Sequence, residues 1–321
     1  MKKRVILVSG GIDSTLAFHL YDNLDDGFEN IPVFFNYGQP YLEKEIKAVK
    51  NIFGDELVLL KLENTIEDDA QNPFVPARNL TLASMVTTIY NPDEIIMAGL
   101  KDDVVVDKNP QAFSEMSEIL SKFSKKEIKV HSPFWDFTKG EIVENFIKSG
   151  GDEKLLKMAV SCYDGADDEH CNDCPACFRR YVALKSNDIE VAVPSKRITE
   201  LYIKNIWKYD EDRRARTFIA VRDLFNDFIS YDIDGVLTNE IDGHDYVNNR
   251  TPRQEYIDKC NNDFDYGNLI VLFTSRMHSD RVVTEQWLEK NGVKYHALIT
   301  GKLPFRKLYD DRAITVPFSK T

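Results

Sequence analysis

Ser9-Gly10-Gly11-Ile12-Asp13-Ser14-Thr15 connects an apolar run, Val5–Val8, to a mostly apolar segment, Leu16–Leu20. This order predicts a buried strand, a glycine-rich turn and then a helix whose first turn carries a carboxylate and hydroxyls. Glycines let a backbone approach an anion closely, and the N–H groups and dipole at a helix start favour a phosphate there. The stretch therefore predicts a phosphate-binding loop, in which Asp13 either caps the helix or holds a cation.

The spacing of this loop separates it from two widespread nucleotide-binding loops. No lysine follows the second glycine, as Gly-x-x-x-x-Gly-Lys-Ser/Thr requires, and the pattern Gly-x-Gly-x-x-Gly does not fit either. Residues 9–14 instead resemble the PP-loop signature of ATP pyrophosphatases, Ser-Gly-Gly-x-Asp-Ser. That resemblance implies a loop that holds the pyrophosphate of ATP while the α-phosphate is attacked. The alternative is a capped helix after a buried strand, with no ligand.

Length and composition indicate a globular protein of one large or two ordinary domains. The chain has 321 residues, of which 43% are hydrophobic, and a net charge of −12. The negative charge argues against strong binding of nucleic acid or anionic membranes, and no apolar run is long enough to span a bilayer. Met1–Arg4 is basic, but the apolar run behind it ends at Val8, too early for a signal peptide. We expect a cytoplasmic protein.

Strand-like and helical runs alternate through the first half of the chain. The predicted strands are residues 5–8, 31–35, 57–62, 94–98 and 128–130, and the predicted helices begin at Asp13 and span 41–53, 79–90, 111–123 and 138–148. This alternation predicts an α/β fold with a doubly wound parallel sheet and helices on both faces. Ligands of such sheets lie beyond the carboxyl ends of the strands, so we expect the site there.

Three connections at that edge carry further candidates. Asn36–Gln39 is either a polar turn or a loop that meets the nucleotide. Arg78, just before a predicted helix, either pairs with a surface carboxylate or binds phosphate as a fork-shaped donor. Thr138 and Glu141 predict a capping box. Lys139 is then left in a first helical turn, where the dipole disfavours a cation and a phosphate partner would explain its position.

Four of the five cysteines fall within sixteen positions, and Cys260 stands alone. The four are Cys162, Cys171, Cys174 and Cys177. In a cytoplasmic protein this clustering indicates metal binding rather than disulfides. Four thiolates suit a closed, tetrahedral structural zinc site, whereas an iron–sulfur cluster and a redox dithiol are the alternatives.

Taken in order, these motifs resemble those of 7-cyano-7-deazaguanine synthases, over about residues 4–185. The motifs are Ser9–Thr15, Phe35–Gln39, Val75–Asn79, Ala98-Gly99, Pro133 with Lys139 and Glu141, Ser161–Tyr163, and the three-cysteine cluster followed by Arg179. The resemblance implies a PP-loop fold, a structural zinc, and synthesis of a nitrile from 7-carboxy-7-deazaguanine, ammonia and ATP. The carboxylate would attack the α-phosphorus, ammonia would displace AMP to give an amide, and a second adenylation would allow elimination to the nitrile.

The loop and the resemblance together predict which residues contact ATP. They are Ser9, Gly10, Gly11, Asp13, Ser14, Thr15, Tyr37, Gln39 and Gly99. Arg78 and Lys139 would offset charge that develops on the phosphates, and Mg²⁺ would accompany the pyrophosphate.

One segment departs from the family pattern. After the Ala-Gly motif the family carries Gly-Tyr-Pro-Asp-Cys-Arg, which contacts the deazaguanine, whereas residues 100–110 here read Leu-Lys-Asp-Asp-Val-Val-Val-Asp-Lys-Asn-Pro. Asp102, Asp103 and Asp107 either accept from the amino and ring N–H groups of a guanine-like edge or form a solvated loop. The identity of the carboxylate substrate and the choice between amide and nitrile therefore stay open.

A second α/β pattern begins at Phe228–Tyr231, a predicted strand that ends at Asp232 and Asp234. Two carboxylates two positions apart point to the same side, where one can attack and the other handle a proton. Thr274 follows the next predicted strand, and Lys302 and the Asp310-Asp311 pair come later. In this order the motifs resemble those of haloacid-dehalogenase-like phosphohydrolases, over about residues 228–317, and most closely a small, nearly capless branch described as capsule-biosynthesis phosphatases.

The second resemblance implies a role for each of these residues. Asp232 would attack phosphorus, and Asp234 would protonate the leaving oxygen and then activate water. Thr274 and Lys302 would bind the transferring phosphoryl group. Mg²⁺ would lie between Asp232, the backbone carbonyl of Asp234 and the Asp310-Asp311 pair. The alternatives are a folded but inactive module and a plain Asp-x-Asp-Gly turn.

We therefore predict a PP-loop synthase-like domain over residues 1–190 with its zinc site at 160–180, a helical connector over 191–227 and a phosphatase domain over 228–321. The predicted protein is a bifunctional enzyme of 7-deazaguanine modified-nucleotide biosynthesis, a homodimer that uses ATP, zinc and magnesium and acts on small molecules. One alternative is PP-loop amidation or thiolation of another substrate. Another is a defence module that attaches a deazaguanine to a macromolecule, with the second domain as a non-catalytic scaffold.

Overall fold

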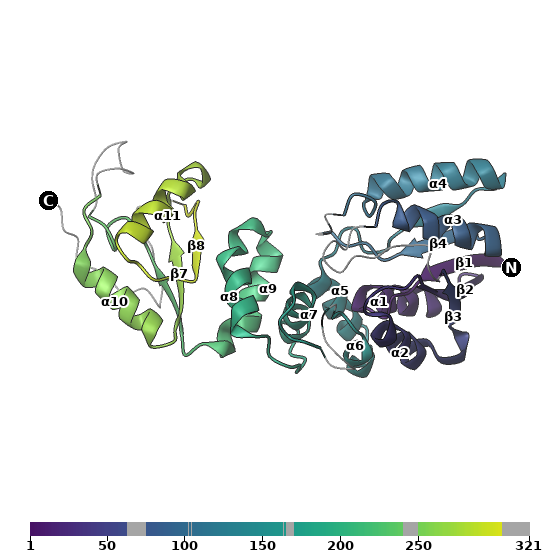
Figure 1. Ribbon diagram of the computed structural model, residues 1–321, viewed down its shortest axis with the longest axis horizontal. Helices are drawn as coiled ribbons and strands as arrows, with labels where there is room; N and C mark the ends of the chain where they lie inside the picture. The colour runs from purple at the N-terminus through teal and green to yellow at the C-terminus, as the bar shows by residue number, and fades with distance from the viewer. Residues whose placement is uncertain are drawn as a thin grey trace. The chain divides into compact units, whose positions relative to one another are not determined.

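The computed structural model describes residues 1–62, 75–101, 103, 105–162, 164, 170–239 and 250–303. The chain divides into two compact units, Met1–Ser195 and Lys196–Thr321 (Figure 1). In the part that is described, no helix is both long and apolar enough to cross a bilayer.

The first unit is built on a five-stranded parallel sheet with the order β3-β2-β1-β4-β5. The strands are β1 (Lys2–Leu7), β2 (Phe28–Asn36), β3 (Val58–Lys61), β4 (Glu94–Met97) and β5 (Lys129–His131). The chain adds β2 and β3 on one side of β1 and then crosses to β4 and β5 on the other. The carboxyl ends of β1 and β4 therefore flank the point where the strand order reverses, which is where ligands of doubly wound sheets bind.

Helices cover both faces of this sheet (Figure 1). They are α1 (Ile12–Asp22), α2 (Leu42–Phe53), α3 (Arg78–Tyr90), α4 (Pro110–Ser124), α5 (Lys139–Lys148), α6 (Glu153–Met158) and α7 (Pro175–Lys185), with a 3-10 turn, η1, at Gly54–Glu56. Successive residues of a strand point to opposite faces, so Ile6 joins the core under α1, α2 and α5–α7, and Val5 joins the core under α3 and α4. The predicted parallel α/β architecture is confirmed for this unit.

A buried arginine ties the amino ends of the strands together. Arg4 is 3% exposed, donates from Nε to Glu94 at 2.7 Å and from Nη2 to Asp26 at 2.8 Å, and lies over the rings of Tyr21 and Phe28. The pKa of Glu94 is lowered to about 2, first by its interaction with His131, whose Nε2 lies 3.6 Å from Oε2 of Glu94, and then by the hydrogen bond and charge of Arg4. This network lies toward the amino ends of the strands, whereas the predicted ligand site lies beyond their carboxyl ends.

We expect the Glu94 network to make the first unit sensitive to acid. Because the pKa of Glu94 is lower in the folded than in the unfolded chain, its contribution is complete above the unfolded value of about 4.5 and is lost as the pH falls toward 2. Urea unfolding between pH 6 and 2.5 measures this: Glu94→Gln should flatten the acid loss of stability, whereas Glu118→Gln, an exposed change on α4, should not. Equal pH slopes for wild type and Glu94→Gln would contradict the assignment.

The second unit contains a three-stranded parallel sheet of order β6-β7-β8. Its elements are α8 (Lys196–Lys204), η2 (Ile206–Lys208), α9 (Glu211–Val221), η3 (Arg222–Leu224), β6 (Phe228–Tyr231), α10 (Gln254–Asp265), β7 (Leu269–Phe273), η4 (His278–Asp280), α11 (Arg281–Lys290) and β8 (Ala297–Ile299). The core combines the sheet with Ile257 and Cys260 of α10 and with Trp287 and Leu288 of α11. The stretch expected as a helical connector forms α8 and α9, and the unit includes it from Lys196 on.

Candidate functional site

The predicted phosphate loop lies between β1 and α1, at the switch point of the sheet. Gly10 has a φ of +74°, a left-handed conformation that favours glycine, and a Cβ there would lie 3.0 Å from Cβ of Ala48. Ser14 Oγ accepts from the Ser9 N–H at 3.1 Å and donates to the Gly11 carbonyl at 3.2 Å, so this hydroxyl holds the turn itself.

The start of α1 offers unused donors to an anion. Its N-cap, Gly11, supplies no side-chain hydrogen bond to the first turn, which leaves backbone N–H groups for a ligand. Thr15 is 1% exposed, and its Oγ1 has no hydrogen-bond partner among the described residues. A buried hydroxyl without a partner is unfavourable, and a phosphate oxygen would satisfy it. The loop therefore fits the pyrophosphate of ATP.

Asp13 does not cap the helix but pairs with Lys139 at the start of α5. The Nζ of Lys139 donates to Oδ1 of Asp13 at 2.5 Å. Burial alone would raise the pKa of Asp13, but the charges of Lys139 and Lys108 and the Lys139 hydrogen bond outweigh it and hold the pKa below its usual value. The capping box of Thr138 and Glu141 is present as predicted. The observed partner of Lys139 is thus the carboxylate of Asp13 in the phosphate loop, which compensates the unfavourable position of a cation at the start of a helix. The contact of Lys139 with ATP stays a prediction.

A second group of predicted residues lies beyond the carboxyl end of β2 and at the start of α3: Tyr37, Gln39 and Arg78. Arg78 Nη1 donates to the Tyr37 hydroxyl at 3.4 Å. Gln39 is 3% exposed: its Oε1 accepts from the Tyr37 N–H at 3.1 Å, and its Nε2 donates to the Phe35 carbonyl at 3.2 Å and to Glu45 at 2.8 Å. Gln39 therefore shapes the loop that presents Tyr37, a role that its polar sequence context alone did not indicate.

Gly99 is required by packing at the end of β4. A Cβ at this position would lie 2.1 Å from the Trp135 ring, and the Gly99 N–H donates to Ser132 Oγ at 2.9 Å. Trp135 is held in turn by an edge-to-face contact with Phe113, with ring centroids 5.0 Å apart. The absence of a side chain at Gly99 thus leaves room for the indole of Trp135.

We predict that Gly99→Ala destabilises the first unit by about 1–3 kcal/mol, because the added methyl forces the indole of Trp135 to move. Urea unfolding monitored by circular dichroism measures the change. A double-mutant cycle with Trp135→Leu supplies the control: the cost of Gly99→Ala should shrink to a few tenths of a kcal/mol when the indole is absent. An undiminished cost in that background would show that Trp135 is not the obstacle.

The acidic segment after Gly99 is largely engaged with its own neighbours. Asp103 accepts from the Leu100 N–H at 3.0 Å and pairs with Lys108 at 2.8 Å. Asp107 accepts at 3.2 Å from the N–H of Asn79, in the first turn of α3. Asp102, the third predicted substrate contact, lies outside the described residues. The structure thus gives Asp103 and Asp107 local structural partners, and their contact with a base stays a prediction.

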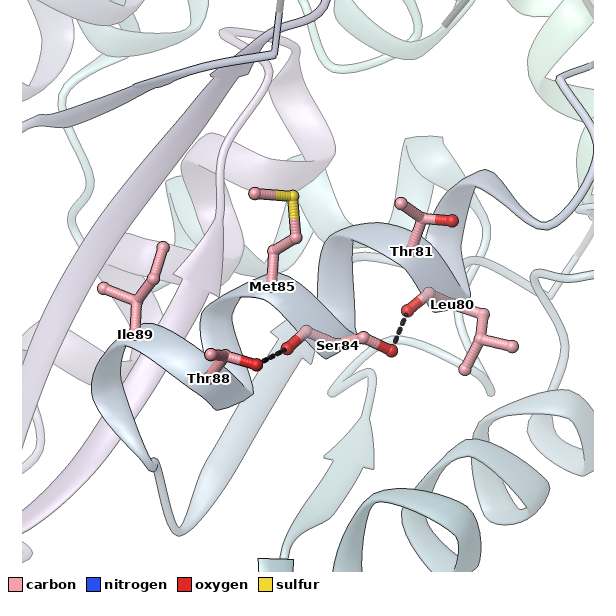
Figure 2. Close-up of a pocket in the computed structure, with 6 residues that line it drawn as sticks. All are labelled: Leu80, Thr81, Ser84, Met85, Thr88 and Ile89. Atoms are coloured by element: carbon pink, nitrogen blue, oxygen red, sulfur yellow. Dashed lines mark hydrogen bonds between the residues drawn. The ribbon is translucent and has the colours of Figure 1, made fainter. Parts of the chain in front are cut away.

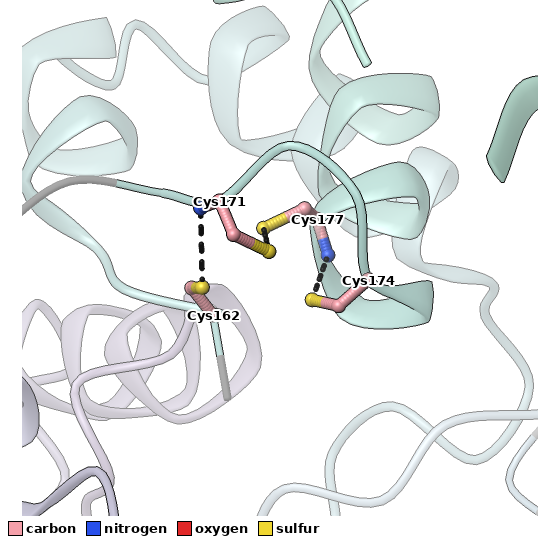
Figure 3. Close-up of side chains that lie close together, drawn as sticks. All are labelled: Cys162, Cys171, Cys174 and Cys177. Carbon is pink, nitrogen blue, oxygen red and sulfur yellow. Dashed lines mark hydrogen bonds between the residues drawn. The ribbon is translucent and has the colours of Figure 1, made fainter. Parts of the chain in front are cut away.

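The four clustered cysteines converge from two segments (Figure 3). Cys162 follows α6, and Cys171, Cys174 and Cys177 surround the start of α7. Their sulfurs all lie within 4.8 Å of one another, and those of Cys171 and Cys177 are 3.9 Å apart. A tetrahedral zinc with bonds of about 2.3 Å holds its sulfurs about 3.8 Å apart, whereas a multi-iron cluster spreads its thiolates further. The donor set and spacing therefore fit one zinc ion.

Burial and crowding raise the pKa values of two of the clustered cysteines. The pKa of Cys177 is raised, first by its hydrogen bond with Cys174 and then by burial, and burial raises the pKa of Cys171. Crowded thiols disfavour the thiolate unless a cation offsets the charge. Among the described residues, this is the one group of His, Cys, Asp and Glu side chains close enough together to bind a metal ion.

A shallow depression on α3 is separate from all these groups (Figure 2). It is lined by Leu80, Thr81, Ser84, Met85, Thr88 and Ile89, all from one helix. The hydroxyls of Ser84 and Thr88 donate to backbone carbonyls four residues earlier in the helix. The depression contains no predicted site residue and offers little for chemistry.

The predicted residues of the second unit gather at the carboxyl ends of its three strands. Asp232 follows β6, and its Oδ2 accepts from Nζ of Lys302, which follows β8, at 2.7 Å. Thr274 follows β7, is fully buried, and accepts at its carbonyl from the Lys302 N–H at 3.0 Å. Asp310 and Asp311 lie outside the described residues, so a magnesium site is not shown.

Arg276 is buried in this site, where the sequence allows either a contact with a large substrate near the mouth of the site or a surface role. Its side chain is 1% exposed, and Nε and Nη2 donate to the two carboxylate oxygens of Asp234 at 2.9 and 2.8 Å. Arg250 lies 3.5 Å from the same carboxylate. The fork-shaped pairing fixes the orientation of Asp234. The position of Arg276 two residues after Thr274, directly behind an apolar strand, is the sequence signal that could have suggested a place in this site.

Comparison with known proteins identifies the first unit. A family model described as queuosine biosynthesis protein QueC matches residues 52–188. The 7-cyano-7-deazaguanine synthase of Methanobrevibacter smithii is 28% identical over 225 residues, which cover 59% of this chain and 96% of that protein. The synthase of Rickettsia canadensis is 30% identical over 226 residues, which cover 59% of this chain and 97% of that protein. This chain belongs to the 7-cyano-7-deazaguanine synthase family.

Nearly the whole length of these synthases is thus present here, and the matched family model ends before the second unit begins. The predicted family is confirmed, whereas the fused phosphohydrolase is not shown. Among solved structures, a predicted subunit of tRNA methyltransferase from Methanocaldococcus jannaschii is 18% identical, with a TM-score of 0.33, over 48% of this chain and 91% of that one. That score is too low to support a structural conclusion.

Proposed function

We propose that the first unit adenylates 7-carboxy-7-deazaguanine with ATP, releasing pyrophosphate, and that ammonia then displaces AMP to give the amide. A second ATP would adenylate the amide oxygen, and loss of that oxygen as AMP would give the nitrile. Membership of the synthase family supports this proposal. The observation that carries it is the convergence, at the carboxyl ends of β1 and β4, of the phosphate loop with Lys139 and Gly99.

The side chains at the carboxyl ends of β1 and β4 would position the substrates and stabilise charge that develops during the reaction. Thr15 and the first N–H groups of α1 would bind the pyrophosphate, which ATP supplies as the leaving group. Lys139 and Arg78 would stabilise the charge that develops between the α- and β-phosphates. Asp13 would hold Lys139 in place, or hold Mg²⁺ once ATP brings it. The four cysteines would bind zinc as a structural ion, because four thiolates leave no open position for chemistry.

We further propose that the second unit hydrolyses a phosphate ester. The pairing of Asp232 with Lys302 beside Thr274 supports this, because it places a carboxylate nucleophile next to groups that bind a phosphoryl oxygen. A non-catalytic scaffold is the competing possibility, and a phosphatase substrate panel on the full chain separates the two.

The test of the first proposal is a turnover experiment. The purified full chain is incubated with ATP, ammonium and 7-carboxy-7-deazaguanine, and AMP and base products are followed by mass spectrometry. Nitrile supports the whole proposal, and amide alone restricts it to the first amidation. AMP release that does not depend on this base would exclude 7-carboxy-7-deazaguanine and favour another PP-loop substrate.

A further inference from the structure

The phosphate loop is bonded to the segment that carries the first zinc-site cysteine. The Val160 N–H donates to the Gly10 carbonyl at 2.8 Å, and the Val160 carbonyl lies 3.6 Å from the position of a Cβ on Gly11. Val160 precedes Cys162 by two residues. Neither glycine has a side chain to anchor it, so this contact restrains the loop from outside.

The other three cysteines surround the start of α7, with their sulfurs within 4.8 Å of that of Cys162 at the end of this segment. The Cys171 N–H donates to Cys162 Sγ at 3.3 Å, and Cys174 Sγ accepts from the Cys177 N–H at 3.4 Å as the N-cap of α7. Arg180, 9% exposed on α7, donates from Nη2 to the carbonyls of Leu156 and Lys157 at 3.5 and 3.4 Å, at the end of α6. The cluster and this arginine therefore hold both ends of the short segment that contacts Gly10.

Helix α7 also reaches the other phosphate-site group. Asn187, just beyond its end, donates from Nδ2 to the Gly140 carbonyl at 3.1 Å, next to Lys139, whose Nζ pairs with Asp13. Helix α7, which begins within the cysteine cluster, and Asn187 beyond its end thus contact the backbone of α6 and the backbone next to Lys139.

From this geometry we propose that the cysteine cluster is a positioning centre for ATP: a zinc ion held by the four thiolates orders the phosphate loop through Val160 and raises the affinity of the chain for a nucleoside triphosphate. The proposal rests on the proposed binding of ATP at that loop. Neutral thiols hold the two segments together weakly, whereas thiolates on a shared ion fix them. An ordered loop loses less conformational freedom when ATP binds, so the affinity rises.

Linkage makes the effect reciprocal. If zinc raises the affinity for ATP by some factor, ATP must raise the affinity for zinc by the same factor. A metal that only stabilised a remote part of the fold would show neither effect while the fold remained intact.

The test uses the full chain in zinc-loaded, chelator-stripped and zinc-restored forms. Calorimetry measures the Kd of α,β-methylene ATP without any base substrate, and hydrogen exchange follows residues 8–16. We expect the Kd to rise about tenfold or more on stripping, to recover with zinc, and exchange to accelerate at residues 8–16 but not in β2 or α4. With a competing chelator, the ATP analogue should tighten zinc binding by the same factor.

Two variants separate positioning from folding. Cys162→Ser should weaken analogue binding and loosen residues 8–16, and Cys260→Ser, a cysteine outside the cluster, should change neither. An unchanged Kd on stripping, loss of exchange protection throughout the first unit, or absence of tightly held zinc would each overturn the proposal. Because these readouts need no turnover, a chain that couples zinc to the analogue but releases no base-dependent AMP would refute the proposed function alone.

Discussion

Lys139→Ala should lower the rate of base-dependent AMP formation by about 10²–10³-fold, a typical loss for one preorganised charge at a transition state. Lys139 donates from Nζ to Asp13 of the phosphate loop at 2.5 Å. Its removal leaves the charge that develops on the pyrophosphate without that partner. Single-turnover quench-flow with radiolabelled ATP measures the rate.

Two companion variants sharpen this prediction. Lys139→Arg keeps the charge and should recover part of the rate. Lys148→Ala removes a lysine from the other end of α5, where the side chain is 70% exposed, and should leave the rate within about twofold of wild type. A loss below tenfold for Lys139→Ala would show that Lys139 serves only to hold Asp13.

The second large effect concerns the other unit. Asp232→Asn should abolish phosphatase activity, with a loss of about three orders of magnitude or more, because an amide cannot replace the carboxylate nucleophile. The same variant should form AMP at the wild-type rate, since the two units have separate cores. Release of phosphate from a substrate panel, followed in parallel with AMP formation, measures both.

Asp227→Asn provides the matched control, because Asp227 is an exposed aspartate at the start of β6 rather than at its end. It should leave phosphate release unchanged. Hydrolysis that survives Asp232→Asn would exclude the assigned nucleophile and favour a contaminating phosphatase or a scaffold role for the unit.

Local features were predictable because they depend on residues a few positions apart. The strand, turn and helix around Ser9–Thr15, the capping box of Thr138 and Glu141, and the four-cysteine cluster all follow from spacing. The pairings that define the sites did not follow. Lys139 meets Asp13 across 126 positions, and Arg276 meets Asp234 across 42. No local sequence pattern specifies which carboxylate forms an ion pair with Lys139 or Arg276.

The amino-acid sequence alone sufficed for the parallel α/β fold of the first unit, the family and the four-cysteine cluster, because hydrophobic periodicity and motif spacing are encoded within short segments. Tertiary packing decided the rest. It placed the ring of Trp135 against Gly99 and joined Val160 to Gly10 beside the cysteine cluster. Both contacts join segments that are far apart in the sequence, and only the assembled sheet and the helices packed on it bring those segments together.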